Sequence, residues 1–204
     1  ILSGDVMLIV AYQLIAQTPT PYLKEVLDLF SKTAAEICEG QQYDVDYEAR
    51  KKVEIDEYIE MIRLKTAVLL GCALKTGAII GNASPEDANL LYECGINIGL
   101  AFQLKDDMLD VYGDEATFGK KIGGDILCNK KTYLLIQALE CAQGEDKVKL
   151  NRFLEDKTLS DAEKIKSVTL MYDKLGVKKK CEDKLRYYYE MAIANLDRIS
   201  VSDN

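Results

Sequence analysis

The 204-residue sequence predicts an all-α protein that forms one soluble domain. Apolar residues recur three and four positions apart along nearly the whole chain, which is the period of an amphipathic helix, and sustained alternation typical of strands is almost missing. Hydrophobic residues make up 48% of the chain and charged residues 29%, a composition that argues against disorder and against a membrane protein. We therefore expect a single helical domain over residues 1–204.

The first half of the chain predicts three helices. An apolar helix stops at Thr18–Pro21, where proline restricts the residue before it, and a second helix runs to about Glu39. A polar connector precedes a third helix that starts near Ile55. This helix is apolar on every side from Ala67 to Leu74, which indicates a buried central element, and the run is far shorter than the roughly 20 residues that a bilayer requires.

The next helix has the clearest start. Ser84 is suited to cap it, Pro85 fits its first turn, and Asp87 completes a capping-box arrangement. The helix is expected to end near Tyr112.

A long glycine-rich loop is expected over residues 113–132, and long ordered loops in compact domains are often functional. Beyond it we expect three helices, broken near residues 143–146 and 157–163, and then a polar tail. We find no internal repeat and no second domain.

Charge and residue usage exclude several function classes. The net charge of -8 disfavours non-specific nucleic-acid binding, which depends on Lys and Arg meeting phosphate. The chain has no His and no C-x-x-C pair, which removes His-based triads and mixed zinc sites. The six cysteines are expected to be free thiols in a reducing cytoplasm. Any chemistry then depends on carboxylates, amides, hydroxyls, lysines or a metal.

The segment "FQLKDDMLDVYGD" places three carboxylates, Asp106, Asp107 and Asp110, on one face of a helix. Like charges at this spacing repel unless a cation intervenes, and Mg²⁺ prefers carboxylate oxygens. A solvated acidic helix turn is the plain alternative. A calcium loop does not fit, because Val111 or Glu115 stands where such a loop requires glycine.

The surrounding residues favour a metal-bridged diphosphate. Gln103 lies one turn before the carboxylates and can present its amide to the same face. The glycine-rich loop that follows supplies basic groups for phosphate: Lys120, Lys121, Lys130 and Lys131. As isolated features these lysines would be read as solvated surface.

Several segments resemble the trans-polyprenyl diphosphate synthases, the family of the farnesyl and geranylgeranyl diphosphate synthases. "FQLKDDMLD" is similar to the family's second aspartate-rich motif, and "GKKIGGDILCNKKTYL" is similar to the glycine-lysine loop after it. "ILSGD", "GQQYD" and "LKT" match in the family's order. The first aspartate-rich motif, D-D-x-x-D, would precede "ILSGD" and does not occur in the chain. Because the chain also opens inside a helix without Met, we expect an N-terminally incomplete fragment that is inactive alone.

The resemblance implies the isoprenoid synthase fold, with helices around a central cavity. It implies that Mg²⁺ binds an allylic diphosphate, which ionises to a carbocation and pyrophosphate before isopentenyl diphosphate attacks. It also implies a cytoplasmic homodimer.

Carried over residue by residue, the resemblance implies metal contact by Asp106, with Asp107 and Asp110 as direct or water-mediated ligands. Thr66 and Gln103 would turn oxygen dipoles toward the carbocation, although either side chain could serve only its own helix. The residues expected to contact the allylic diphosphate are Lys65, Lys130 and one of Lys120 or Lys121. Gln41 and Asp44 match the family without a role that we can derive.

Two alternatives remain at this point. The chain could belong to a non-catalytic partner subunit of the same fold, in which the missing motif is truly absent, or to a terpene cyclase, which shares the fold and the metal. The complete second motif disfavours the first, and the lysine-rich loop disfavours the second. The length of the product, farnesyl or geranylgeranyl, is left open.

Overall fold

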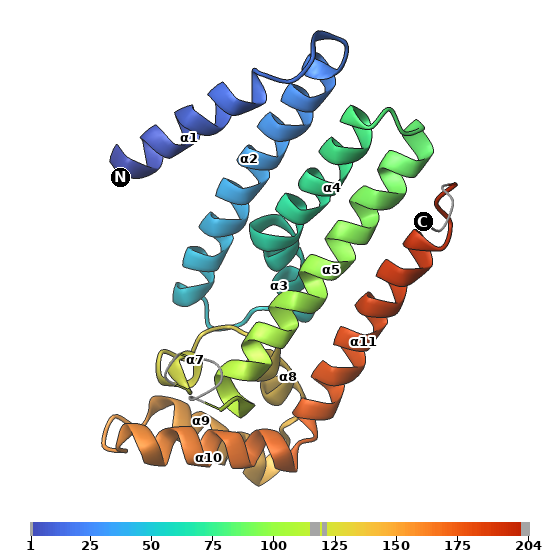
Figure 1. Ribbon diagram of the computed structural model, residues 1–204. Coiled ribbons are helices and arrows are strands. Elements are labelled where there is room, and N and C mark those ends of the chain that lie inside the picture. The colour runs from blue at the N-terminus through green and yellow to red at the C-terminus, as the bar shows by residue number, and fades with distance from the viewer. Residues whose placement is uncertain (1, 115–118, 120–121, 201–204) are drawn as a thin grey trace.

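The computed structural model describes residues 2–114, 119 and 122–200, and this part of the chain is helical and without strands, as expected (Figure 1). The helices are α1 (Leu2–Ile15), α2 (Thr20–Ala49), α3 (Ile55–Ile62), the π-helix η1 (Arg63–Ala67), α4 (Val68–Ile80), α5 (Pro85–Tyr112), α7 (Gly124–Leu127), α8 (Tyr133–Cys141), α9 (Gly144–Glu155), α10 (Asp161–Lys174) and α11 (Val177–Leu196).

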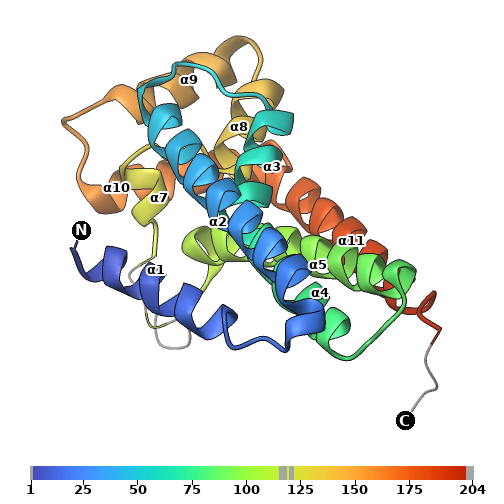
Figure 2. The same ribbon diagram turned by 90° about the horizontal axis from the view of Figure 1, so that it is seen from above.

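The long helix α5 is the centre of the arrangement. It packs against α4 on one side and α11 on the other, and α2 covers α4 and η1. The helices α9 and α10 cross one end of this bundle, close to the C-terminal end of α5 (Figures 1 and 2). The C-terminal end of α5 therefore meets the loop that carries α7.

The start of α5 has the predicted cap. The Ser84 hydroxyl oxygen accepts a hydrogen bond from the Asp87 backbone N–H at 3.0 Å, and the hydroxyl donates to the Asp87 carboxylate at 2.8 Å. Pro85 occupies the first turn. Further along, a Cβ at Gly99 would lie 2.4 Å from the Ala67 Cα, so glycine at this position lets α5 approach η1 closely.

The expected end of the second helix near Glu39 is wrong, because α2 continues to Ala49 through the polar segment. Gly40 is buried inside this helix, and a Cβ there would lie 2.4 Å from the Lys65 backbone nitrogen. Packing against η1 thus stabilises a helix across a sequence whose composition indicates a connector.

The third helix also differs from the expectation of burial on every side. It is interrupted by the π-helix η1, and α4 buries Val68 and Cys72 but leaves Leu69 51% and Leu74 38% exposed. The reason is that α4 packs mainly against α5 and α2, which leaves part of its surface to solvent.

Between Tyr133 and Ser200, the described residues form four helices, not three. The additional break lies between α10 and α11, where Gly176 has a φ of 67°, a left-handed conformation that glycine adopts readily. The expected breaks near residues 143–146 and 157–163 are confirmed, and the preceding loop contains the short helix α7.

The helix α1 differs from the others because none of its residues is buried. It packs along α2, while Leu2, Met7 and Leu14 are 80%, 69% and 62% exposed. Within the described residues, no helix is both long enough and apolar enough to cross a membrane.

Candidate active site

The last two turns of α5 carry the three aspartates of the acidic segment, and they face different surroundings. Asp107 is buried, with 3% of its surface exposed, whereas Asp106 and Asp110 are partly exposed. The 100° step of the helix accounts for this difference, since Asp107 faces Tyr58 of α3, whereas the Asp110 carboxylate faces the Asp125 backbone N–H in α7.

Asp107 is held by two donors. The Tyr58 hydroxyl donates to its Oδ2 at 2.5 Å, and the Gln103 side-chain amide donates to its Oδ1 at 3.1 Å. Burial raises the pKa of Asp107 to about 6, although both hydrogen bonds favour the charged form and lower the pKa. The carboxylate is therefore ionised near neutral pH.

Asp110 anchors the loop that follows. Its Oδ2 accepts a hydrogen bond from the Asp125 backbone N–H at 3.0 Å, and its carbonyl oxygen accepts one from the Gly123 N–H at 2.6 Å. Gly123 has a φ of 83°, which favours glycine. The loop thus folds back onto the end of α5 and brings Asp125 to the acidic side chains.

Two lysines enter the site from different elements. Lys65 of η1 forms an ion pair with Asp44 of α2 at 2.6 Å, and Lys130 lies 3.7 Å from Asp125. Burial lowers the pKa of Lys130, but the carboxylates of Asp125, Asp107 and Asp44 outweigh burial and raise it above its ordinary value. Lys130 is therefore a charged ammonium group.

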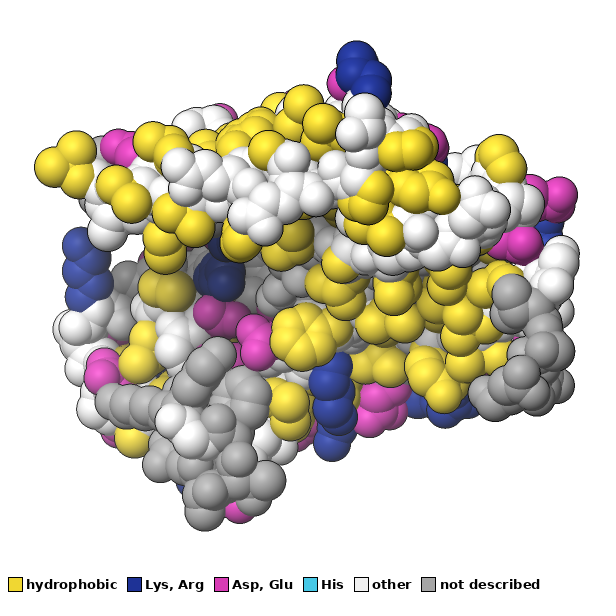
Figure 3. Space-filling view, turned by 45° about the horizontal axis from the view of Figure 1, so that its top comes forward, with side chains coloured by type: hydrophobic (Ala, Val, Ile, Leu, Met, Phe, Trp, Pro, Cys, Tyr) yellow, Lys and Arg dark blue, Asp and Glu magenta, His cyan; other side chains and the backbone are white. Residues whose placement is uncertain are grey.

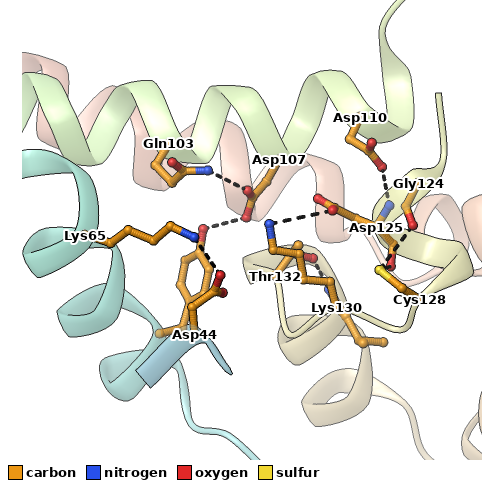
Figure 4. Close-up of polar contacts among 12 residues, drawn as sticks. Asp44, Lys65, Gln103, Asp107, Asp110, Gly124, Asp125, Cys128, Lys130 and Thr132 are labelled. Atoms are coloured by element: carbon orange, nitrogen blue, oxygen red, sulfur yellow. Dashed lines mark hydrogen bonds and ion pairs between the residues drawn. The ribbon is translucent and has the colours of Figure 1, made fainter. Parts of the chain in front are cut away.

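These groups meet around a cavity of about 20 Å³, which is room for about one water. In Figure 4 the Lys130 amino group lies between the carboxylates of Asp107 and Asp125, and the Lys65 amino group points into the same space. Figure 3 shows acidic and basic side chains next to one another in a hollow of the surface, beside a broad apolar area. The residues that line the cavity are Asp44, Tyr58, Met61, Ile62, Lys65, Gln103, Asp107 and Lys130.

Thr66 and Gln103 also lie side by side. The Thr66 hydroxyl donates to the Gln103 Oε1 at 3.2 Å across 37 residues of sequence. Lys65 and Thr66 both belong to η1, and π-helical turns inside α-helices occur frequently at functional sites.

The remaining predicted site residues lie at the edge of this arrangement or outside it. Lys131 donates to the Asn129 carbonyl at 3.4 Å, and Gln41 is exposed on α2. Lys120 and Lys121 lie outside the described residues, so their expected diphosphate contact stays a prediction.

Sequence reasoning gave no role to Asp44, Tyr58 and Asp125, which the structure places in the site. The signal in the sequence for Asp44 is its place in the segment "GQQYD", which matches the family. The signal for Asp125 is that it is the one acidic residue in "GKKIGGDILCNKKTYL". The sequence carries no comparable signal for Tyr58, because its partner Asp107 is 49 residues away.

The oxygen donors suit Mg²⁺, which usually takes one or two carboxylates and completes its shell with water and substrate phosphates. Burial raises the pKa of Asp125, Lys130 opposes this effect, and the nearby charges of Asp110 and Asp106 raise it further. A cation would relieve this repulsion. Within the described residues, no group of three or more acidic or cysteine side chains is placed to hold a metal ion by itself.

A wider groove of about 850 Å³ lies between α5 and α11. Its lining is predominantly apolar and includes Ile98, Phe102, Met108, Leu185 and Tyr189. The candidate active site is the smaller cavity, because charged groups from α2, η1, α5 and the loop after α7 converge there.

The fold and the site define an all-helical protein whose carboxylates and lysines face one another at the end of a central helix. The chain belongs to the polyprenyl synthetase family, whose family model matches residues 1–171. This membership confirms the resemblance found in the acidic segment and the lysine loop.

Related proteins agree with this assignment. The chain is 40% identical over 166 residues to a short chain isoprenyl diphosphate synthase of Methanothermobacter thermautotrophicus, covering 79% of this chain and 51% of the relative. It is 34% identical over 210 residues to a geranylgeranyl diphosphate synthase of Sulfolobus acidocaldarius, covering 98% and 61%. A crystal structure of a geranylgeranyl pyrophosphate synthase matches with a TM-score of 0.92 and 41% identity, covering 98% and 62%. The chain thus spans about half to three fifths of these proteins, and their fold confirms the expected isoprenoid synthase architecture.

Proposed function

We propose that this chain is the part of a short-chain all-trans prenyl diphosphate synthase that carries the second acidic motif. The proposed reaction joins isopentenyl diphosphate to an allylic diphosphate, dimethylallyl or geranyl, and gives farnesyl or geranylgeranyl diphosphate and pyrophosphate. The observation that carries the proposal is the convergence of Lys65, Gln103 and Lys130 beside the carboxylates of α5. The names of the relatives support the same substrate class.

The charged residues of the site suit the first step, in which the allylic C–O bond breaks and pyrophosphate leaves. Lys65 and Lys130, which line the cavity, would hold the diphosphate together with Lys120 or Lys121, while Asp106 and Asp110 would face Mg²⁺. When bound, Mg²⁺ supplies positive charge that stabilises the leaving pyrophosphate.

Two polar residues of the site, Thr66 and Gln103, suit the carbocation that this step leaves behind. The oxygens of Thr66 and Gln103 lie next to each other and would face the cation. Isopentenyl diphosphate then attacks the cation through its double bond and loses a proton, which lengthens the chain by five carbons. The family resemblance implies that Asp107 is either a direct or a water-mediated metal ligand. Because both of its oxygens accept hydrogen bonds from the protein, we propose a water-mediated role.

Two assignments follow from the family and belong to the proposal. We propose that the complete enzyme acts as a homodimer in the cytoplasm. We also propose that the 204 residues alone do not turn over substrate, because they carry only one of the family's two aspartate-rich motifs.

The proposal is tested on the complete subunit with Mg²⁺, isopentenyl diphosphate and dimethylallyl diphosphate. We expect prenyl diphosphate products by chromatography, and Lys130→Ala should raise the KM for the allylic substrate at least about tenfold, because a charge-assisted contact to phosphate is lost. Lys149→Ala is the matched control, since Lys149 is an exposed lysine on α9 that pairs with Glu145. No product from the wild-type subunit, or equal effects of the two substitutions, would contradict the proposal.

A further inference from the structure

Tyr58 is a buried tyrosine of α3 whose hydroxyl forms a hydrogen bond with Asp107. Only 2% of its surface is exposed, and its hydroxyl donates to the Asp107 Oδ2 at 2.5 Å. A hydroxyl that donates to an ionised carboxylate forms a short, charge-assisted hydrogen bond, which is stronger than a neutral one. Tyr58 therefore contributes a specific contact in addition to its packing in the core.

Asp107 has competing partners in the same cavity. Lys65 and Lys130 both line it, and the charge of Asp107 contributes, after that of Asp125, to the raised pKa of Lys130. A carboxylate that loses its hydroxyl donor turns toward the nearest ammonium group, because an unpaired buried charge is costly. Asp107 would then neutralise a lysine that the diphosphate needs.

The same carboxylate also fixes the orientation of Gln103. The amide NH₂ of Gln103 donates to Asp107, and its oxygen accepts from Thr66, so the two ends of the amide are distinguished by their partners. If Asp107 moved, the Gln103 amide would lose the hydrogen bond that orients its NH₂ group. The effect of Tyr58 thus extends to Thr66 through one carboxylate and one amide.

We propose that Tyr58 is a positioning residue: its hydroxyl holds Asp107 so that this carboxylate does not pair with Lys65 or Lys130 in addition to their partners Asp44 and Asp125, which limits competition with the diphosphate for both lysines, and it fixes the Gln103 amide. This inference rests on the proposed function for the identity of the ligand. It assigns Tyr58 no contact with substrate.

The experiment is titration calorimetry of the complete subunit with Mg²⁺ and an unreactive thio-analogue of the allylic diphosphate. Tyr58→Phe removes the hydroxyl and keeps the ring, and we expect it to raise the Kd about tenfold or more. Tyr133→Phe is the matched control, since this buried ring packs against Tyr58 with centroids 6.3 Å apart and does not hydrogen-bond to Asp107 within the described structure. It should leave the Kd within about twofold.

The Asp107→Asn background separates positioning from packing. A neutral Asn cannot neutralise a lysine, so adding Tyr58→Phe to Asp107→Asn should change the Kd less than about twofold. An undiminished effect in that background, or no effect of Tyr58→Phe in the wild type, would overturn the proposal.

Folding and function are controlled separately. Urea unfolding checks that each variant is folded. If Tyr58→Phe alone fails to fold, the double variant still leaves no buried charge without a partner. If the wild-type subunit binds the analogue with Mg²⁺ but forms no product, the proposed reaction fails while the binding cycle still decides the role of Tyr58.

Discussion

Asp106 and Asp107 are neighbours in sequence, yet α5 places them on two sides of the site. On the inner side, Asp107 is buried and fully engaged with Tyr58 and Gln103. On the outer side, Asp106 and Asp110 are partly exposed and face the loop that carries Asp125. The comparison teaches that one acidic motif lies in two environments, and we propose that the inner carboxylate organises protein groups while the outer ones meet a ligand-bound cation.

The largest expected effect concerns the outer side. In the complete subunit, Asp106→Asn should lower kcat by about 10²–10³-fold and change KM less, because it removes charge that acts on the transition state. Asp183→Asn is the control, an exposed aspartate of α11 that pairs with Lys179. Steady-state kinetics at limiting Mg²⁺ measure both. An Asp106→Asn variant with full kcat would show that the outer face is only a solvated acidic turn.

The inner side predicts a pH-dependent stability. Burial raises the pKa of Asp107 to about 6 from the ordinary 3.8, so its contribution to folding is fully present below about pH 4 and is lost as the pH rises through 6. Urea unfolding of the 204-residue chain in chelator should show wild type losing up to about 3 kcal/mol relative to Asp107→Asn between pH 4 and pH 7. A difference that stays constant with pH, or grows in the other direction, would show that Asp107 is not buried as described.

A smaller effect concerns the packing that places Lys65 and Thr66 on the inner side. Gly40→Ala would put a Cβ 2.4 Å from the Lys65 backbone nitrogen, and we expect a loss of about 1–3 kcal/mol in the free energy of unfolding. Gly77→Ala in α4 is the matched control, because among the described residues no heavy atom outside its own stretch of helix lies within 4 Å of a Cβ at this position. It should be neutral or stabilising by up to about 1 kcal/mol. Equal stabilities of the two variants, measured by urea unfolding, would contradict the close contact between α2 and η1.

The sequence predicts the outer side better than the inner side, for a physical reason. The shared face of Asp106 and Asp110 follows from helix geometry over a few residues, and the Ser84 cap is equally local. The contact between Tyr58 and Asp107 joins residues 49 apart, and that between Lys65 and Asp44 joins residues 21 apart. Such pairs depend on how helices pack, which periodicity does not specify.

The same limit explains the main error in the fold. Residues 40–49 have the composition of a connector, and only the approach of η1 to Gly40 shows why the helix continues. Helices that depend on tertiary contacts override local propensity in this way. The elements with a strong period and a clear cap, α5 above all, were predicted with nearly their observed ends.

The most direct test of the two-sided site is the coupling between metal and diphosphate in the complete subunit. Titration calorimetry with the thio-analogue, first in Mg²⁺ and then in excess chelator, gives the factor by which metal tightens the ligand. If the outer carboxylates hold Mg²⁺ only together with a diphosphate, this factor should be about 5–150, and by reciprocity the analogue tightens Mg²⁺ equally. Equal affinities in the two conditions would contradict a bridging metal and leave the lysines as the whole diphosphate site.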